Sequence, residues 1–291
     1  MGSTSFNTAL RAISSDGKFQ SFYINGGAVS SAAAAAVGTG GNPITIGTNG
    51  AGNNFPVNAE IFDILVWNAP LTPAQYMQAQ MWACDKYAKP YPWAGLTSFN
   101  TFFGDSITQG VAGAGTVNIN QQAPFVAAQT LGLSFGQWHN VAIGGVTTAH
   151  MDTLAATWID PIPALIGKKH NVTGFEWHNE NLANPTLPQP YNHAVTYLAN
   201  RKLIANQRTV WGTSTSEGAD PIANRAAYNA SFDAAHPANL IDSYIPIHTD
   251  AHIGVDGSYA TYTPGGDGVH LSATTYAYLA ALFVAGINAL P

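Results

Sequence analysis

The stretch that decides the fold is residues 97–107, which read TSFNTFFGDSI. Its first seven residues, 97–103, predict a short strand, and Gly104 lets the chain turn sharply where that strand ends. Similar short apolar segments recur downstream, each separated from the next by a stretch long enough for a helix. Repeated strand–helix units of this length predict a parallel sheet that is covered by helices on both faces.

The alternation of strands and helices continues to the end of the chain. We expect strands at residues 97–103, 137–142, 172–177, 209–212 and 240–244. We expect helices near residues 121–131, 149–158, 190–206, 221–234 and 273–288. In such sheets ligands bind beyond the carboxyl ends of the strands, so the polar residues that directly follow each strand are the candidates for a functional site.

Ser106 follows the first of these strands and is the candidate nucleophile. A hydroxyl is a poor nucleophile until a base takes its proton, and a histidine base needs an acid to fix its tautomer. A glycine-rich segment near the C-terminus offers both, because Asp267 and His270 stand three residues apart. Asp233 and His236 have the same spacing, but they end an alanine-rich helical segment before a proline, where a solvated structural pair is the better interpretation.

A tetrahedral intermediate also needs hydrogen-bond donors where its negative charge develops. After the first predicted strand, the backbone N–H of Ser106 can point at such an oxyanion. After the second, the N–H of Gly145 can approach closely because glycine has no Cβ, although the adjacent Gly144 could take this role. After the third, the side-chain amide of Asn179 would complete the oxyanion hole.

Taken together, these segments resemble the four sequence blocks of the SGNH (GDSL-type) hydrolases. Ser106 lies in Gly-Asp-Ser-Ile, Gly145 in Asn-x-x-x-x-Gly-x-Thr-Thr, and the final block is Asp-x-x-His, all in the family's order. The resemblance implies a flavodoxin-like, three-layer α/β/α domain with a parallel sheet. It implies Ser106 as nucleophile, His270 as general base and then acid, and Asp267 as the residue that orients the histidine. It also implies an oxyanion hole formed by the N–H groups of Ser106 and Gly145 and the amide of Asn179.

The resemblance covers about residues 98–291 and departs from the family at the third block. That block usually reads Gly-x-Asn-Asp, whereas this chain has Trp177-His178-Asn179-Glu180. Trp177 adds bulk beside the oxyanion hole and could instead shape an acyl or sugar pocket. His178 could line the site or form a structural hydrogen bond to a strand. We therefore treat Trp177 and His178 as candidate substrate-binding residues.

Residues 1–92 predict a small β-rich accessory domain, followed by the catalytic domain at 93–291. Expected strands are at 19–24, 43–47 and 61–67, with turn signals at 16–17 and 25–27 and the alanine run at 32–36 as a loop. Thr72 is a plausible N-cap with Pro73 at the first helical position, which predicts a helix to about Tyr87.

The order of these N-terminal pieces resembles the back half of a concanavalin-like or laminin-G-like jelly roll. This resemblance implies a lectin-like domain, although ninety residues supply fewer strands than such a sandwich normally has. Either the chain is trimmed at its front or this sheet docks onto the second domain. Tyr23 and Trp67 could stack on sugars, but alternating aromatic residues in a strand are more often part of a core.

Composition excludes several classes of protein. Ten Lys+Arg against sixteen Asp+Glu give a net charge of −6, and the chain has no basic cluster that could bind the phosphates of a nucleic-acid backbone. No apolar run approaches the roughly 20 residues of a membrane span. Only 9% of the residues are charged, which suits secreted or cell-surface proteins that handle carbohydrate. The first six residues lack the basic and apolar regions of a signal peptide.

We expect no cofactor and no metal. The single cysteine, Cys84, excludes a disulfide framework and a cysteine-rich metal site. His248, Asp250 and His252 look like a metal-ligand run in one loop, but no fourth ligand is indicated, and a polar lid segment explains them more simply.

The leading hypothesis is a serine esterase that forms a covalent acyl-Ser106 intermediate. Its substrate would carry short acyl groups, acetyl especially, on a carbohydrate or a similar small-molecule or polysaccharide alcohol. One alternative is a lipid or aryl ester hydrolase of the same family, although the sequence shows no long apolar lid. A second alternative is a glycan-binding protein whose hydrolase domain is inert.

Overall fold

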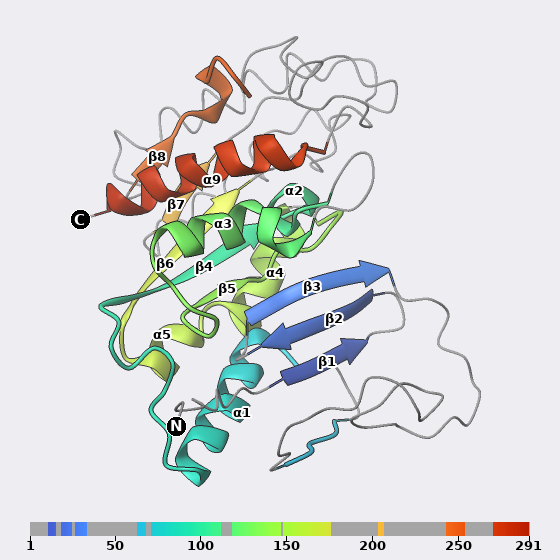
Figure 1. The fold of residues 1–291 in the computed structure, drawn as a ribbon, viewed down its shortest axis with the longest axis vertical. Coiled ribbons are helices and arrows are strands. Elements are labelled where there is room, and N and C mark those ends of the chain that lie inside the picture. Colours follow the sequence, from blue (N-terminus) through green and yellow to red (C-terminus); the bar gives the residue numbers. More distant parts are fainter. Residues whose placement is uncertain are drawn as a thin grey trace, which may run out of the picture.

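A computed structural model of the chain shows a three-stranded antiparallel sheet and a five-stranded parallel sheet (Figure 1). The structure describes residues 11–15, 19–24, 27–33, 63–67, 71–111, 118–146, 148–175, 203–206, 243–253 and 270–290. The strands of the first sheet are β1 (Arg11–Ser15), β2 (Phe19–Ile24) and β3 (Gly27–Ala33), in the order β1-β2-β3.

The parallel sheet has the strand order β5-β4-β6-β7-β8. Its strands are β4 (Ser98–Gly104), β5 (Trp138–Asn140), β6 (Lys169–Phe175), β7 (Leu203–Asn206) and β8 (Ser243–Ile245). The chain therefore leaves the first strand, β4, to form β5 on one side and then returns to form β6 on the other. This is the flavodoxin-like order, whose ligands bind beside the first strand, where the direction of winding reverses. The predicted parallel α/β sheet is confirmed.

Helices cover both faces of this sheet. The helices are α1 (Pro73–Lys86), α2 (Ser106–Gln109), α3 (Ala123–Thr130), α4 (Thr148–Trp158), α5 (Ile162–Ile166) and α9 (Ala273–Asn288), with 3-10 turns at Ile119–Gln121 and Ile247–Thr249. Phe99 and Phe102 of β4 point to opposite faces because side chains alternate along a strand. They accordingly belong to two separate hydrophobic clusters.

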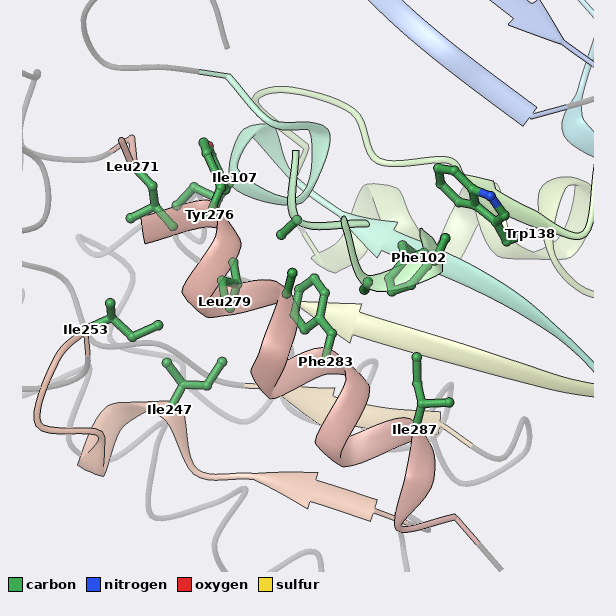
Figure 2. Packing of buried hydrophobic residues seen from close by; sticks show 14 of the residues in the cluster. Phe102, Ile107, Trp138, Ile247, Ile253, Leu271, Tyr276, Leu279, Phe283 and Ile287 are labelled. Carbon is green, nitrogen blue, oxygen red and sulfur yellow. The ribbon is translucent and has the colours of Figure 1, made fainter. Parts of the chain in front are cut away.

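The larger cluster lies between the sheet and the helices α3 and α9. Figure 2 shows Leu279, Phe283 and Ile287 of α9 on the side of the helix that faces Phe102 and Trp138. The rings of Phe102 and Phe283 lie 5.7 Å apart. The smaller cluster, on the opposite face, consists of Met77, Trp93, Phe99, Ile162 and Ile166. It brings α1 and α5 against β4, so the sheet is the middle of three layers.

Two predicted helices are confirmed almost to the residue. Thr72 caps α1 through a capping box with Gln75, and Pro73 is its first residue, as expected. Ser272 caps α9, whose bounds match the predicted helix at 273–288. None of the described helices has both the length and the apolar character that crossing a membrane requires.

Three predictions for residues 1–92 are wrong. Residues 63–67 form no strand, and Val66 is 76% exposed, because high β-propensity does not stabilise a strand without a paired neighbour. Trp67 is 44% exposed, so its interpretation as a core residue fails as well. Ala32 and Ala33 belong to β3 rather than to a loop, since they pair with Gln20 and Phe19 of β2.

The end of the predicted helix at 190–206 is also wrong, because residues 203–206 form strand β7. This short apolar run pairs with β6 on one side and β8 on the other, and periodicity alone cannot tell such a run from a helix segment. The sequence analysis did not foresee β1, α2 or α5. The strands predicted at 43–47 and 209–212 and the helix at 221–234 lie outside the described residues, and the domain boundary at residue 92 stays a prediction.

Candidate active site

Strand β4 delivers Ser106 to the carboxyl edge of the parallel sheet. Gly104 ends the strand, and Asp105 caps the short helix α2, its side chain accepting the N–H of Ile107 at 2.9 Å. Asp105 is fully buried, and Ser106 is partly exposed as the first residue of the helix. The first N–H groups of a helix have no acceptor within it, so the Ser106 N–H is available to a ligand at this edge.

His270 lies within hydrogen-bonding distance of Ser106. Its Nε2 is 2.8 Å from the Ser106 Oγ, although the two residues are 164 positions apart in the sequence. His270 directly precedes the buried Leu271 and the N-cap Ser272, so the start of α9 holds it in place. The structure thus brings together the predicted serine and histidine.

A second hydrogen bond ties the two segments that carry this pair. The Tyr276 hydroxyl, on the first turns of α9, donates to the backbone carbonyl of Val111, which follows α2. The Tyr276 side chain is fully buried among Ile107 and Leu271, as Figure 2 shows. Residues flanking the serine therefore pack directly on residues flanking the histidine.

The glycine turn after β5 lies against Ser106. The Ile143 N–H donates to the Gly104 carbonyl at 2.9 Å, which continues the β4–β5 ladder past the end of β5. The Val146 N–H closes a β-turn on the Ile143 carbonyl, and Gly145 has φ +77°, the left-handed value that a type II turn requires at its third residue. A Cβ placed on Gly144 would lie 3.6 Å from the Ser106 Cβ.

Two residues hold this turn and α2 together, and the sequence analysis gave neither of them a role. The Gln109 Oε1 accepts the N–H of Gly144 at 2.9 Å. The Asn140 Nδ2 donates to the Thr108 carbonyl at 3.2 Å, and its Oδ1 accepts the N–H of Ala142 at 3.2 Å. Asn140 ends β5 and Gln109 lies one helical turn after Ser106, but these positions alone do not indicate which backbone groups the two side chains bond.

The remaining predicted site residues, Asp267, Asn179, Trp177 and His178, lie outside the described residues, and their roles stay predictions. The described residues contain no group of three or more His, Cys, Asp or Glu side chains that could hold a metal ion. Asp250 instead anchors its own loop, its Oδ1 accepting two backbone N–H groups at 2.8 and 3.0 Å and its Oδ2 the Tyr278 hydroxyl at 2.7 Å.

Comparison with known proteins identifies the fold. No protein-family model and no curated protein matches the chain. Among solved structures it is similar to the lipase/acylhydrolase from Enterococcus faecalis, with a TM-score of 0.51 and 18% identity over 66% of this chain and 97% of that chain. It is also similar to a member of the lipolytic protein G-D-S-L family from Veillonella parvula, with a TM-score of 0.47 and 14% identity over 66% of this chain and 98% of that chain.

With a TM-score of 0.51, the likeness to the Enterococcus faecalis structure shows which fold the chain has. The strand order, the position of Ser106 directly after the first strand and the covering helices all agree with it. The parallel-sheet part of this chain has the α/β fold of the SGNH (GDSL-type) hydrolases.

Proposed function

We propose that the chain is a serine esterase that hydrolyses carboxylic esters through a covalent acyl-Ser106 intermediate. The observation that carries the proposal is the 2.8 Å separation of Ser106 Oγ and His270 Nε2 at the carboxyl edge of β4. A nucleophile and a base within 2.6–3.2 Å of each other, at the edge where α/β sheets bind ligands, is the arrangement that acyl transfer requires.

In the first half of the reaction, Ser106 Oγ attacks the carbonyl carbon of the ester while His270 Nε2 takes the hydroxyl proton. The carbonyl oxygen becomes an oxyanion, which the N–H groups of Ser106 and Gly145 and the amide of Asn179 stabilise. The tetrahedral intermediate then collapses, and His270 gives the proton to the leaving alcohol. The products of this step are the free alcohol and acyl-Ser106.

In the second half, a water molecule attacks the acyl carbon and His270 takes its proton. The second tetrahedral intermediate expels Ser106, which receives the proton back from His270, and the carboxylic acid leaves. Asp267 accepts the remaining ring N–H of His270, which keeps Nε2 directed at the serine. The Gly145 N–H is suited to its role, because within the part of the chain that the structure describes it donates no other hydrogen bond.

The proposed substrate is a short acyl ester, acetyl especially, on a carbohydrate or similar polar alcohol. Its support is compositional: only 9% of residues are charged, and the sequence contains no long apolar lid that would cover a long acyl chain. An extracellular or cell-surface location would fit such a substrate. A series of p-nitrophenyl esters from acetyl to dodecanoyl tests the acyl length, and activity that rises with chain length would favour the lipid alternative.

The experiment that tests the function is Ser106→Ala, assayed with p-nitrophenyl acetate and acetylated xylan. Loss of the nucleophile should lower kcat by about 10⁴-fold or more while the chain remains folded. Ser134→Ala is the matched control, since it makes the same change at an exposed serine in the loop before β5. Turnover by Ser106→Ala close to that of Ser134→Ala would reject the proposal.

A further inference from the structure

The glutamine that ends α2 contacts the glycine turn at the candidate oxyanion hole. Gln109 Oε1 accepts the Gly144 N–H at 2.9 Å, and a Cβ on Gly144 would lie 2.9 Å from the same oxygen. The same hypothetical Cβ would lie 3.6 Å from the Ser106 Cβ. The turn, the glutamine and the serine therefore converge on one point, and this approach requires glycine at position 144.

The peptide whose direction matters most is the one between Gly144 and Gly145, because it carries the Gly145 N–H. It is the central peptide of the turn, and rotating it converts a type II turn into a type I turn and reverses the direction of this N–H. Two flanking glycines offer little steric resistance to such a rotation. The orientation must therefore be held by hydrogen bonds around the turn.

Hydrogen bonds on both sides of this peptide hold it in the described structure. The Ile143 N–H donates to Gly104, and the Val146 N–H donates to Ile143, so both are bonds between backbone groups. The Gly144 N–H instead donates to the side chain of Gln109. This bond holds the peptide immediately before the central one, and it originates from the same short helix as the nucleophile.

We propose that Gln109 is a positioning residue that keeps the Gly145 N–H directed at the developing oxyanion on a substrate bound to Ser106. The inference rests on the proposed esterase function and adds to it a residue that acts through Gly144 and Gly145. Because the oxyanion exists only in the transition state and the tetrahedral intermediate, loss of this contact lowers kcat and leaves KM nearly unchanged.

The test replaces Gln109 with methionine, which keeps the length of the side chain and removes the acceptor oxygen. With p-nitrophenyl acetate, Gln109→Met should lower kcat by about 10- to 100-fold, less than the loss of a whole oxyanion donor, with KM within about two-fold of the wild type. Gln129→Met near the end of α3 is the matched control, since among the described residues its amide bonds just the Leu133 carbonyl, and it should retain wild-type kcat.

A double-mutant cycle separates positioning from general stability. Gly144→Ala breaks the same hydrogen bond from the other side, because its Cβ displaces the flexible end of Gln109. If the bond is what matters, the kcat of the double variant Gln109→Met, Gly144→Ala is within about three-fold of the weaker single variant. If the fold losses in kcat of the two single variants instead multiply in the double variant, the inference is overturned. If Gln109→Met does not fold, as judged by circular dichroism, Gly144→Ala alone must show the selective loss of kcat.

Inhibition by phenylboronic acid gives a readout that a purely structural role would not change. The Ser106 oxygen adds to boron as its proton passes to His270, which produces a tetrahedral, negatively charged boronate that imitates the intermediate. Its inhibition constant should rise in Gln109→Met by about the factor by which kcat falls. If the wild type is active but Gln109→Met keeps the wild-type kcat and inhibition constant, the inference fails and the proposed function stands. If the wild type has no esterase activity, the proposed function fails and the inference fails with it.

Discussion

Replacing His139 should make the protein more resistant to mild acid. His139 lies in the middle of β5, is 1% exposed, and packs edge-on against Phe99 with ring centres 5.0 Å apart. Neither of its ring nitrogens has a hydrogen-bond partner in the part of the chain that the structure describes. Burial without a partner disfavours the charged ring and lowers the pKa of His139 from 6.5 to about 3.

The sign and size of the effect follow from this pKa. Above pH 6.5 the ring is neutral in both the folded and the unfolded chain, and its contribution to stability does not change. Between pH 6.5 and about pH 3, His139 binds a proton in the unfolded chain but not in the folded chain. The free energy of unfolding therefore falls by about 1.4 kcal/mol per pH unit, or about 2 kcal/mol between neutral pH and pH 5.

Urea denaturation of the wild type and of His139→Leu at pH 7 and pH 5 measures this term. Leucine has a similar volume and cannot be protonated, and the other titrating groups cancel in the difference between the two proteins. His139→Leu should gain about 2 kcal/mol relative to the wild type on moving from pH 7 to pH 5. An equal loss of stability by wild type and His139→Leu would refute the reasoning.

Two further changes test how the site is held. Tyr276→Phe removes the hydrogen bond to the Val111 carbonyl. It should lower the free energy of unfolding by about 1 kcal/mol and reduce kcat. Equal stability of the variant and the wild type in urea would show that the bond is dispensable. Asp105→Ala removes the N-cap of α2 and should lower the free energy of unfolding by about 1–2 kcal/mol. Asp105→Asn keeps an acceptor oxygen, so urea denaturation should show that it retains most of the stability that Asp105→Ala loses.

The parts of the fold that the sequence predicted well are those with local signals. The caps at Thr72 and Ser272 and the apolar spacing behind them define α1 and α9 without reference to the rest of the chain. The errors concern segments whose state depends on a distant neighbour. Residues 203–206 form a strand because two strands pair with them. Residues 63–67, of which 64–67 are apolar, form no strand because none of the described strands pairs with them.

The candidate site divides in the same way. Ser106 and His270 could be predicted to meet, because a nucleophile after the first strand needs a base and the carboxyl edge of a parallel sheet collects the loops that supply it. Gln109 and Asn140 could not be assigned roles, because each bonds a backbone group more than thirty residues away. No residue pattern marks a contact between a side chain and the backbone of another loop.

Site-specific labelling tests the central claim most directly. A fluorophosphonate transfers its phosphonyl group to a serine oxygen that a nearby base has activated, with loss of fluoride and the hydroxyl proton. Digestion and mass spectrometry of the treated wild type should find one phosphonyl group, on Ser106, and His270→Ala should remain unlabelled under the same conditions. Labelling of another serine, or equal labelling of Ser106 in wild type and His270→Ala, would contradict the account.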